Sequence, residues 1–265
     1  MAIFIRELTR NRKSFITWTA SLVASNVLML MFFPYMDIKM DAMDEMLKQM
    51  PEGMISAMNL GSMDFSKILS YFSYIFQYIL LFSAIYAMQF GAGILSREES
   101  ERTIEFLLAK PIKRREVVTS KILCLLFYFA IFNIIFAVAD YVTIIAITKQ
   151  SFSMQAFLLL HLGQLLLQLL FASGGLLISV FVVKTATILP LSIGVVLGTY
   201  FISIASGISE KLANLKYITP FEYVTPADII KANSIEPVYV IIICTVVITA
   251  IAGAYVFYNR KDIVG

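Results

Sequence analysis

The longest charged stretch of the chain is residues 97–121, REESERTIEFLLAKPIKRREVVTSK. It begins with acidic side chains and ends with basic ones: Glu98, Glu99 and Glu101, then Lys110, Lys113, Arg114 and Arg115. Long hydrophobic runs flank it on both sides, and a helix needs about 20 apolar residues to cross a bilayer. The stretch therefore predicts a surface segment between two membrane spans, and with it an all-α polytopic membrane fold.

The pattern inside this stretch predicts a short helix. Ser96 and Glu99 have the spacing of a capping box, which starts helices. Three apolar residues then recur at helical spacing on one face: Ile104, Leu107 and Leu108. Pro111 ends the helix because it lacks a backbone N–H and disfavours a helical residue before it. The residues alone leave two interpretations, a solvated loop or an amphipathic helix at the membrane surface that a soluble partner grips.

The composition supports the same fold class. The chain has 265 residues, of which 59% are hydrophobic and 15% charged, whereas soluble domains average about 45–50% apolar and about 25% charged. The apolar blocks predict a single transmembrane domain over 1–265, with six spans at 14–34, 68–95, 122–147, 157–183, 185–206 and 238–258. An interfacial amphipathic helix is predicted at 1–13, and short helices outside the bilayer at 35–67 and 207–237.

Six spans place both termini on one side of the lipid bilayer. That side carries 14 Lys and Arg residues, and the other side carries seven. Because cytoplasmic loops hold the excess of Lys and Arg, both termini and the 97–121 loop are predicted to be cytoplasmic, in a multi-pass protein of the cell (plasma) membrane. Segments 35–67 and 207–237 are then extracellular. The net charge of +3 is too small to indicate nucleic acid as a partner.

No residue pattern indicates catalysis. The sequence lacks a G-x-x-x-x-G-K-[ST] phosphate loop, an H-E-x-x-H zinc motif and a G-x-S-x-G nucleophile turn. Cys124 and Cys244 lie in hydrophobic runs, which predicts packing residues rather than a disulfide or metal ligands. The chain is therefore predicted to be non-catalytic and to hold no metal or cofactor, so energy from ATP must come from a second polypeptide.

Polar side chains inside the predicted spans are candidates for a substrate path: Gln77, Asn133, Asp140, His161, Gln164 and Gln168. The last three share one helix face. Interhelical hydrogen bonding is the commoner use of such groups and is the favoured interpretation. Asp140 and His161 leave open an ion-coupled secondary transporter or channel, since ionisable groups in spans are functional candidates. A third alternative is a membrane-anchored immunity or sensor protein that binds through 35–67.

The charged stretch resembles the cytoplasmic loop of ABC-2 type permeases, the membrane subunits of one class of ATP-binding-cassette transporters. The matching positions are Glu98, Thr103, Ile104, Glu105, Leu107, Leu108, Pro111, Arg114, Ser120, Lys121 and Ile122. Arg102 stands where that family usually has glycine, so the start of the helix can differ locally. Two further elements resemble the family: Pro220, Phe221 and Tyr223 before the last span, and the tail residues Arg260, Lys261 and Asp262.

The resemblance implies that 97–121 carries a coupling helix that docks on an ABC ATPase subunit. The implied contact residues are Glu98, Glu99, Thr103, Ile104, Glu105, Leu107, Leu108 and Pro111. It also implies two ATPase copies that bind ATP and Mg²⁺, together with a second permease copy or a similar permease. The expected function is therefore a permease subunit that exports a hydrophobic or amphipathic substrate, such as a peptide, lipid or drug.

Overall fold

The structure is a computed structural model that describes residues 2–36, 49, 64, 66–100, 113–182, 184–208 and 210–261. In these ranges the regular elements are all helices, without strands. The α-helices are α1 (Ala2–Leu30), α2 (Phe33–Met36), α5 (Ile68–Ser100), α7 (Arg114–Ile147), α8 (Met154–Ser179), α9 (Ile188–Ile208), α10 (Pro226–Ala232) and α11 (Pro237–Arg260). The 3-10 helices are η2 (Thr185–Thr187), η3 (Glu210–Tyr217) and η4 (Glu222–Val224).

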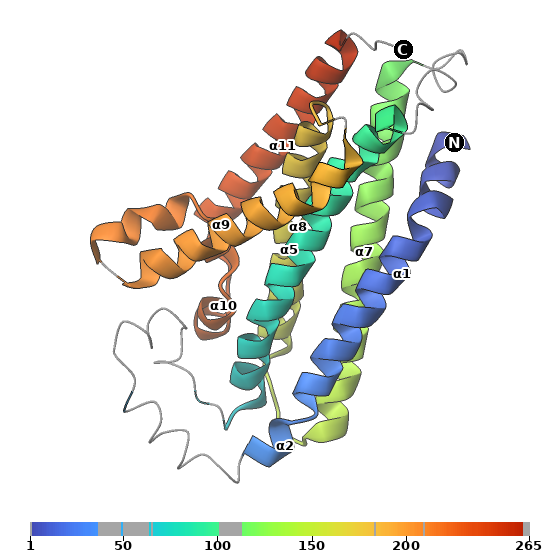
Figure 1. The fold of residues 1–265 in the computed structure, drawn as a ribbon. Coiled ribbons are helices and arrows are strands. Elements are labelled where there is room, and N and C mark those ends of the chain that lie inside the picture. Colours follow the sequence, from blue (N-terminus) through green and yellow to red (C-terminus); the bar gives the residue numbers. More distant parts are fainter. Residues whose placement is uncertain are drawn as a thin grey trace.

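Within the described ranges, six helices are long and apolar enough to cross a membrane. They are α1 continued through α2, α5, α7, α8, α9 with the preceding η2, and α11. The start of α1 and the end of α11 lie at the same end of the bundle (Figure 1), as an even number of crossings requires. We call this the terminal end, and the end that holds α10 the opposite end. The architecture confirms the predicted all-α fold with six spans.

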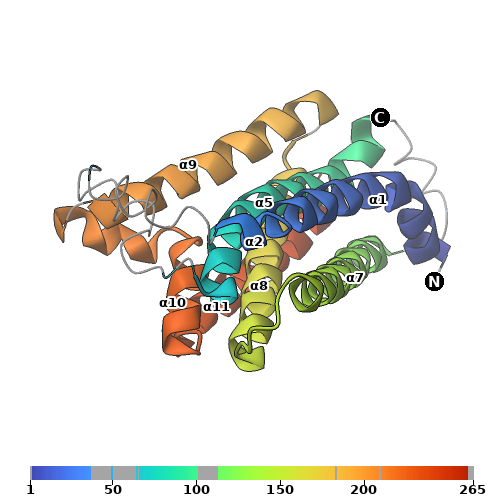
Figure 2. The ribbon, with the colours of Figure 1, turned by 90° about the horizontal axis from the view of Figure 1, so that it is seen from below.

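Helix α5 is the centre of the bundle. Nearly all of its apolar stretch is buried, whereas α9 and α11 expose most of theirs. It contacts α8 most extensively and also touches α1 and α9, as the view from below shows (Figure 2). The core is rich in aromatic rings, among them the stacked pair of Phe132 and Phe136, whose centroids are 4.7 Å apart. The exposed apolar faces of the outer helices suit contact with lipid.

The crossing of α5 and α8 depends on two glycines. A Cβ atom added to Gly91 would lie 2.1 Å from the backbone carbonyl oxygen of Ala172, and one added to Gly175 would lie 2.5 Å from that of Met88. The two backbones therefore touch directly, because neither position has room for a side chain. Small residues at helix crossings allow this close approach in membrane bundles.

The first helix differs from the sequence prediction. We expected an interfacial helix at 1–13 followed by a separate span, but α1 runs from Ala2 to Leu30 without a break. The physical reason is that this segment contains no glycine or proline to interrupt a helix. In addition, Glu7 and Asn11 point into the bundle and are buried. A separate interfacial helix is therefore not supported.

The predicted helix start at Ser96 is wrong. Helix α5 continues to Ser100, and the Ser96 hydroxyl donates to the carbonyl of Ala92 inside that helix. Helix α7 begins at Arg114, earlier than the predicted start of that span at 122. The flanks of the charged stretch thus belong to α5 and α7. The predicted coupling helix, with its apolar stripe, and most of segment 35–67 lie outside the described residues.

Replacing Gly175 by alanine is expected to destabilise the bundle, because the new methyl group would meet the backbone of α5. Overpacking costs typically about 1–3 kcal/mol, which outweighs the gain of about 1 kcal/mol in helix propensity from Gly to Ala. The matched control is Gly174→Ala, since a Cβ at Gly174 has no neighbour within 4 Å. The apparent melting temperature in detergent should fall for the first variant and stay level or rise for the second. Equal shifts would contradict the proposed backbone contact.

Candidate functional site

A buried cluster of charges joins three helices at the terminal end. Lys121 of α7 is fully buried, and its ammonium lies 3.1 Å from a carboxylate oxygen of Glu98 on α5 and 3.3 Å from one of Glu7 on α1. The same ammonium donates a hydrogen bond of 2.6 Å to the backbone carbonyl of Ile94. Glu7 and Glu98 are only 2% and 1% exposed. We call Glu7, Glu98 and Lys121 the basal cluster.

The sequence brings these charges together by placing each on the inward face of its helix. Glu7 and Asn11 are one turn apart on α1, and both are buried. Glu98 lies one turn after Ile94 near the end of α5, and Lys121 lies two turns into α7. A buried charge without a partner is strongly unfavourable. The ammonium therefore fixes the start of α1, the end of α5 and the start of α7 relative to one another.

Neighbouring side chains hold the basal cluster in place. The Asn11 amide donates to the Glu7 backbone carbonyl at 2.9 Å and lies 3.4 Å from the Glu7 carboxylate. Arg97 donates to the Asn11 carbonyl oxygen at 2.9 Å, which gives α5 a further contact with α1. The Tyr128 hydroxyl of α7 donates to the backbone carbonyl of Leu8. The first turns of α1 are thus bound by both of its neighbours.

The other flank of the charged stretch is tied to the last helix. The Arg114 guanidinium donates to three backbone carbonyls at the end of α11: Tyr258 and Asn259 at 3.3 Å each, and Lys261 at 2.7 Å. A cation at a helix C-terminus satisfies open carbonyls and complements the helix dipole. Lys261 in turn donates to the carbonyl of Val180 just after α8, at 2.6 Å. Arg114 therefore links the start of α7 to the ends of α11 and α8.

Residues 101–112 connect these two sets of contacts and lie outside the described residues. On the side of α5, Glu98 pairs with Lys121 of α7, which also pairs with Glu7 of α1. The Ser100 hydroxyl lies 3.4 Å from the Thr185 hydroxyl at the start of η2. On the side of α7, Arg114 donates hydrogen bonds to the end of α11. The described residues on either side of 101–112 are thus joined to most spans of the bundle.

The structure describes few of the predicted partner contacts. Glu98 lies in the basal cluster and not on an exposed rim, so it would have to leave Lys121 to reach another chain. The side chain of Glu99 and all of the remaining predicted contacts are outside the described residues: Thr103, Ile104, Glu105, Leu107, Leu108 and Pro111. Glu98 and Lys121 match the family motif in the sequence, but neither their pairing nor the part played by Glu7 was predicted. The available signal was the Glu7–Asn11 spacing on a segment otherwise rich in apolar and basic residues.

Five of the six polar residues predicted to line a substrate path lie in one buried zone between α7 and α8. Asn133 donates to the Gln168 carbonyl oxygen at 2.7 Å. Asp140 accepts a hydrogen bond of 2.6 Å from Asn26 of α1, a partner that the sequence analysis missed, and its other oxygen lies 3.7 Å from His161. Gln164 is fully buried on the same face of α8. Asn133, Gln168 and Asp140 thus make hydrogen bonds between helices, whereas Gln164 and His161 make none to another helix among the described residues.

Gln77 lies apart from that zone, where its amide donates to the Tyr200 hydroxyl of α9 at 3.3 Å. The five clustered residues are each at most 8% exposed. In this conformation they therefore do not line an open path. Their role as substrate contacts stays a prediction.

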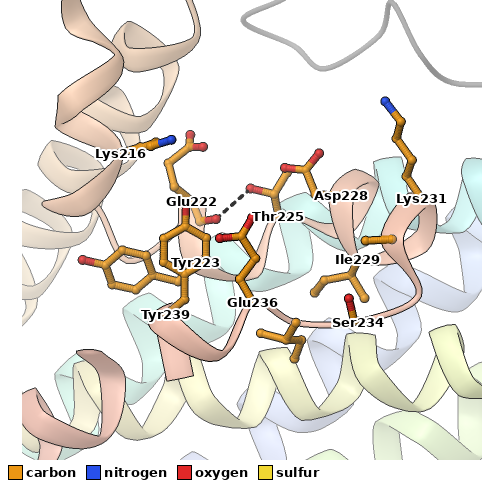
Figure 3. Close-up of a pocket in the computed structure, with 12 residues that line it drawn as sticks. Lys216, Glu222, Tyr223, Thr225, Asp228, Ile229, Lys231, Ser234, Glu236 and Tyr239 are labelled. Carbon is orange, nitrogen blue, oxygen red and sulfur yellow. Dashed lines mark hydrogen bonds between the residues drawn. The ribbon is translucent and has the colours of Figure 1, made fainter. Parts of the chain in front are cut away.

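A cavity of about 580 Å³ lies at the opposite end, between η4, α10 and the start of α11 (Figure 3). Its charged lining residues are Lys216, Glu222, Asp228, Lys231 and Glu236. Tyr223 and Tyr239 stack beside them, with ring centroids 5.0 Å apart. Burial raises the pKa of Glu222, and a hydrogen bond from Ser203 opposes this. Burial also raises the pKa of Asp228, and Lys231 opposes it. Both carboxyls therefore take up protons at higher pH than exposed ones do.

Comparison with known proteins assigns the chain to a family. The family model described as ABC-2 family transporter protein matches residues 1–263, which is nearly the whole chain. No curated protein matches the sequence. The match agrees with the resemblance drawn from the charged stretch and covers the basal cluster, the buried polar zone and the cavity alike.

Replacing Lys121 by alanine is expected to weaken the terminal end, because two buried carboxylates lose their cation. Breaking a buried ion pair costs about 3–5 kcal/mol. Cys124 is fully buried one turn after Lys121 and reports this change, while Cys244 is exposed and is replaced by serine. Maleimide should label Cys124 at least about tenfold faster in Lys121→Ala, since 1.4 kcal/mol is a factor of ten.

The matched control is Lys113→Ala, because Lys113 is exposed just before α7. In Lys113→Ala, maleimide should label Cys124 at the wild-type rate. A neutral version of the cluster, Lys121→Met with Glu7→Gln and Glu98→Gln, should label more slowly than Lys121→Ala, because no charge is then left without a partner. Equal labelling rates in Lys121→Ala and Lys113→Ala would show that the basal cluster does not hold the helices together.

Proposed function

Because this chain belongs to the ABC-2 family of transporter proteins, we propose that it is the membrane subunit of an ATP-driven exporter. Family membership and the six apolar helices make it a multi-pass permease subunit that associates with an ABC ATPase. We further propose that both termini are cytoplasmic and that two ATPase copies bind on that side. The proposal also adds a second permease copy or a similar permease, and a hydrophobic or amphipathic cargo such as a peptide, lipid or drug.

The observation that carries the proposal is the anchoring of the charged stretch. Residues 101–112 contain Ile104, Leu107 and Leu108, the residues of the predicted apolar stripe, which in this proposal seats in a groove of a partner. The helices on either side of it end in buried or hydrogen-bonded contacts with other spans, through Glu98 on one side and Arg114 on the other. A force applied to this segment would therefore have a direct route into the bundle, as the proposed drive by a separate ATPase requires.

The proposed cycle uses these contacts in turn. Closure of the ATPase pair around ATP pushes residues 101–112 toward the membrane. Through Glu98 and Lys121 the push moves α1 together with α7, and through Arg114 it moves the end of α11. The pair of subunits then opens a path for cargo by alternating access or by lateral release into the bilayer. Each of these steps is part of the proposal.

The surface of the bundle supports an apolar or amphipathic cargo. Large hydrophobic side chains are exposed along α7, α9 and α11, whereas the ionisable residues inside the spans are few and buried. Such a surface suits a molecule that enters from the lipid phase better than a sugar or an inorganic ion. The excess of Lys and Arg on the side of the termini supports the proposed cytoplasmic location of the ATPase.

The competing function, an ion-coupled transporter or channel, depends on Asp140 and His161. These side chains are 0% and 5% exposed and face each other between helices. An ion that crosses the membrane would have no open approach to them in this conformation. The geometry therefore favours the ATP-driven permease.

Introducing two charges into the apolar stripe, Ile104→Asp with Leu107→Asp, should abolish docking of the ATPase. Each buried aliphatic side chain contributes about 1.5–3 kcal/mol, so the pair should weaken the complex by at least about a hundredfold. The measurement is the amount of ATPase subunit, and of ATP hydrolysis, that co-purifies with the tagged permease from its native membrane. Unchanged co-purification would count against the coupling role of the segment.

The matched control is Ile218→Asp, which also adds a carboxylate in place of isoleucine. Ile218 is 64% exposed in the turn after η3. This turn lies between the fifth and sixth apolar helices, on the opposite side of the predicted membrane from the charged stretch. This variant should retain the ATPase at the wild-type level. If both variants lose the ATPase equally, the loss reflects general damage and not the apolar stripe.

A further inference from the structure

We propose that Asp140 and His161 form a proton-binding site inside the bundle, and that its proton holds α1, α7 and α8 together. The inference concerns the helix packing alone, so it stands whether or not the ATPase partner and the cargo are as proposed above.

The geometry of the pair leaves one place for a proton. One carboxylate oxygen of Asp140 accepts the hydrogen bond from Asn26 at 2.6 Å. The other lies 3.7 Å from Nε2 of His161. Among the described residues this oxygen has no hydrogen-bond donor, and the ring nitrogens of His161 make no hydrogen bond in good geometry, although the Gln164 side chain on the same helix is close enough to interact with the imidazole. The distance is slightly too long for a hydrogen bond, and a small shift would close it.

The groups around the pair offer no counter-charge. From α5, the rings of Phe72 and Phe76 lie 6.1 and 5.2 Å from the imidazole, centroid to centroid. From α8, the Phe157 ring lies at 4.6 Å, and the neutral amide of Gln164 is buried one turn further on. From α1, the facing group is the neutral Asn26 amide. On α7, the nearest titratable neighbour is Tyr141, which packs on Phe157 and is partly exposed.

Proton counting then fixes the state of the pair. Asp140 and His161 are both buried, so an excess charge at either would be strongly unfavourable. With no proton, a carboxylate is left beside a neutral imidazole. With two protons, an imidazolium is left beside a neutral carboxyl. One proton gives either a neutral pair or an ion pair, and both have zero net charge. The site therefore binds one proton, which the Asp140 carboxylate and the neutral His161 imidazole share. No other reactant takes part.

The proton connects three helices. Asp140 belongs to α7, its amide donor to α1 and its imidazole partner to α8. With the proton in place, both carboxylate oxygens are engaged across helix boundaries. Without it, the negative charge would draw in water and separate α7 from α8. Protonation of the site thus stabilises the packing of α1, α7 and α8 in a pH-dependent way.

The test compares how the stability of purified permease in detergent depends on pH. In the unfolded chain His161 loses its proton near about pH 6.5 and Asp140 near about pH 3.9. The folded wild type retains one proton, so it binds one more than the unfolded chain above about pH 6.5, and stability should fall there with a slope of one proton. Below that pH the folded and the unfolded chain bind the same number of protons at these two residues. The contribution of the site to stability should therefore not change with pH down to about pH 5.

In the variant Asp140→Asn, the change of stability with pH should have the opposite sign. Its folded site holds a neutral imidazole and a neutral amide, so stability should rise with pH up to about pH 6.5 and stay flat above it. The matched control, Glu116→Gln, changes an exposed carboxyl on the same helix and should follow the wild type. Comparing variants with the wild type cancels contributions from other carboxyls, such as Glu222 and Asp228. A stability difference between the wild type and Asp140→Asn that stays flat or rises between about pH 6.5 and 8 would overturn the proposal.

A second measurement does not depend on whether the variant folds. His161 is the only histidine of the chain, so permease labelled with ¹⁵N-histidine gives one pair of ring nitrogen signals. In the folded wild type these signals should remain unchanged from about pH 5 to about pH 8 and report a hydrogen-bonded Nε2. An ordinary imidazole titration within that range would overturn the proposal, because it would show that the site gains or loses its proton freely.

Discussion

The rest of the structure depends on a single constraint: a charge inside this bundle must have a partner. Lys121 satisfies it with two carboxylates from two other helices, at 3.1 and 3.3 Å. Each of the three helices could pack in several registers by apolar contacts alone, since such contacts are non-directional. The ammonium permits one register, because any slide along a helix axis would leave a charge unpaired in a medium where that is strongly unfavourable.

The same constraint acts a second time on the same two helices. Glu7 and Asn26 are 19 residues apart on α1, and Lys121 and Asp140 are also 19 residues apart on α7. At 1.5 Å per residue, the two polar contacts are separated by about 28 Å along the pair. Helices joined at both ends move as one body. The α5–α8 pair is a second body, because its backbones touch at Gly91 and Gly175.

The sequence was sufficient for the fold class but not for the site. Hydrophobic runs long enough to span a bilayer predicted all six apolar helices, because that property belongs to each segment by itself. The Ser96–Glu99 pattern misled, since a serine inside a helix can donate to its own backbone as readily as it can cap a new helix, and here it bonds to Ala92. The pairing of Glu7 with Lys121 could not be predicted, because it depends on which helix faces which, and many such choices bury the same apolar area.

The two bodies differ from the remaining helices in a way that bears on mechanism. Helices α9 and α11 bury little of their apolar surface, so they hold their positions by fewer contacts than α5 or α8. The end of α11 is held by hydrogen bonds from Arg114, at one edge of the charged stretch, and by the bond from Lys261 to Val180, whereas the other edge of the stretch enters the basal cluster. A displacement of that stretch would therefore act on α5 through Glu98 and on α7 through Arg114, and it would reach α11 only through the hydrogen bonds from Arg114. If the charged stretch is pushed as proposed, α11 could then move relative to the two bodies, and opening a path through a bundle requires such relative motion between helices.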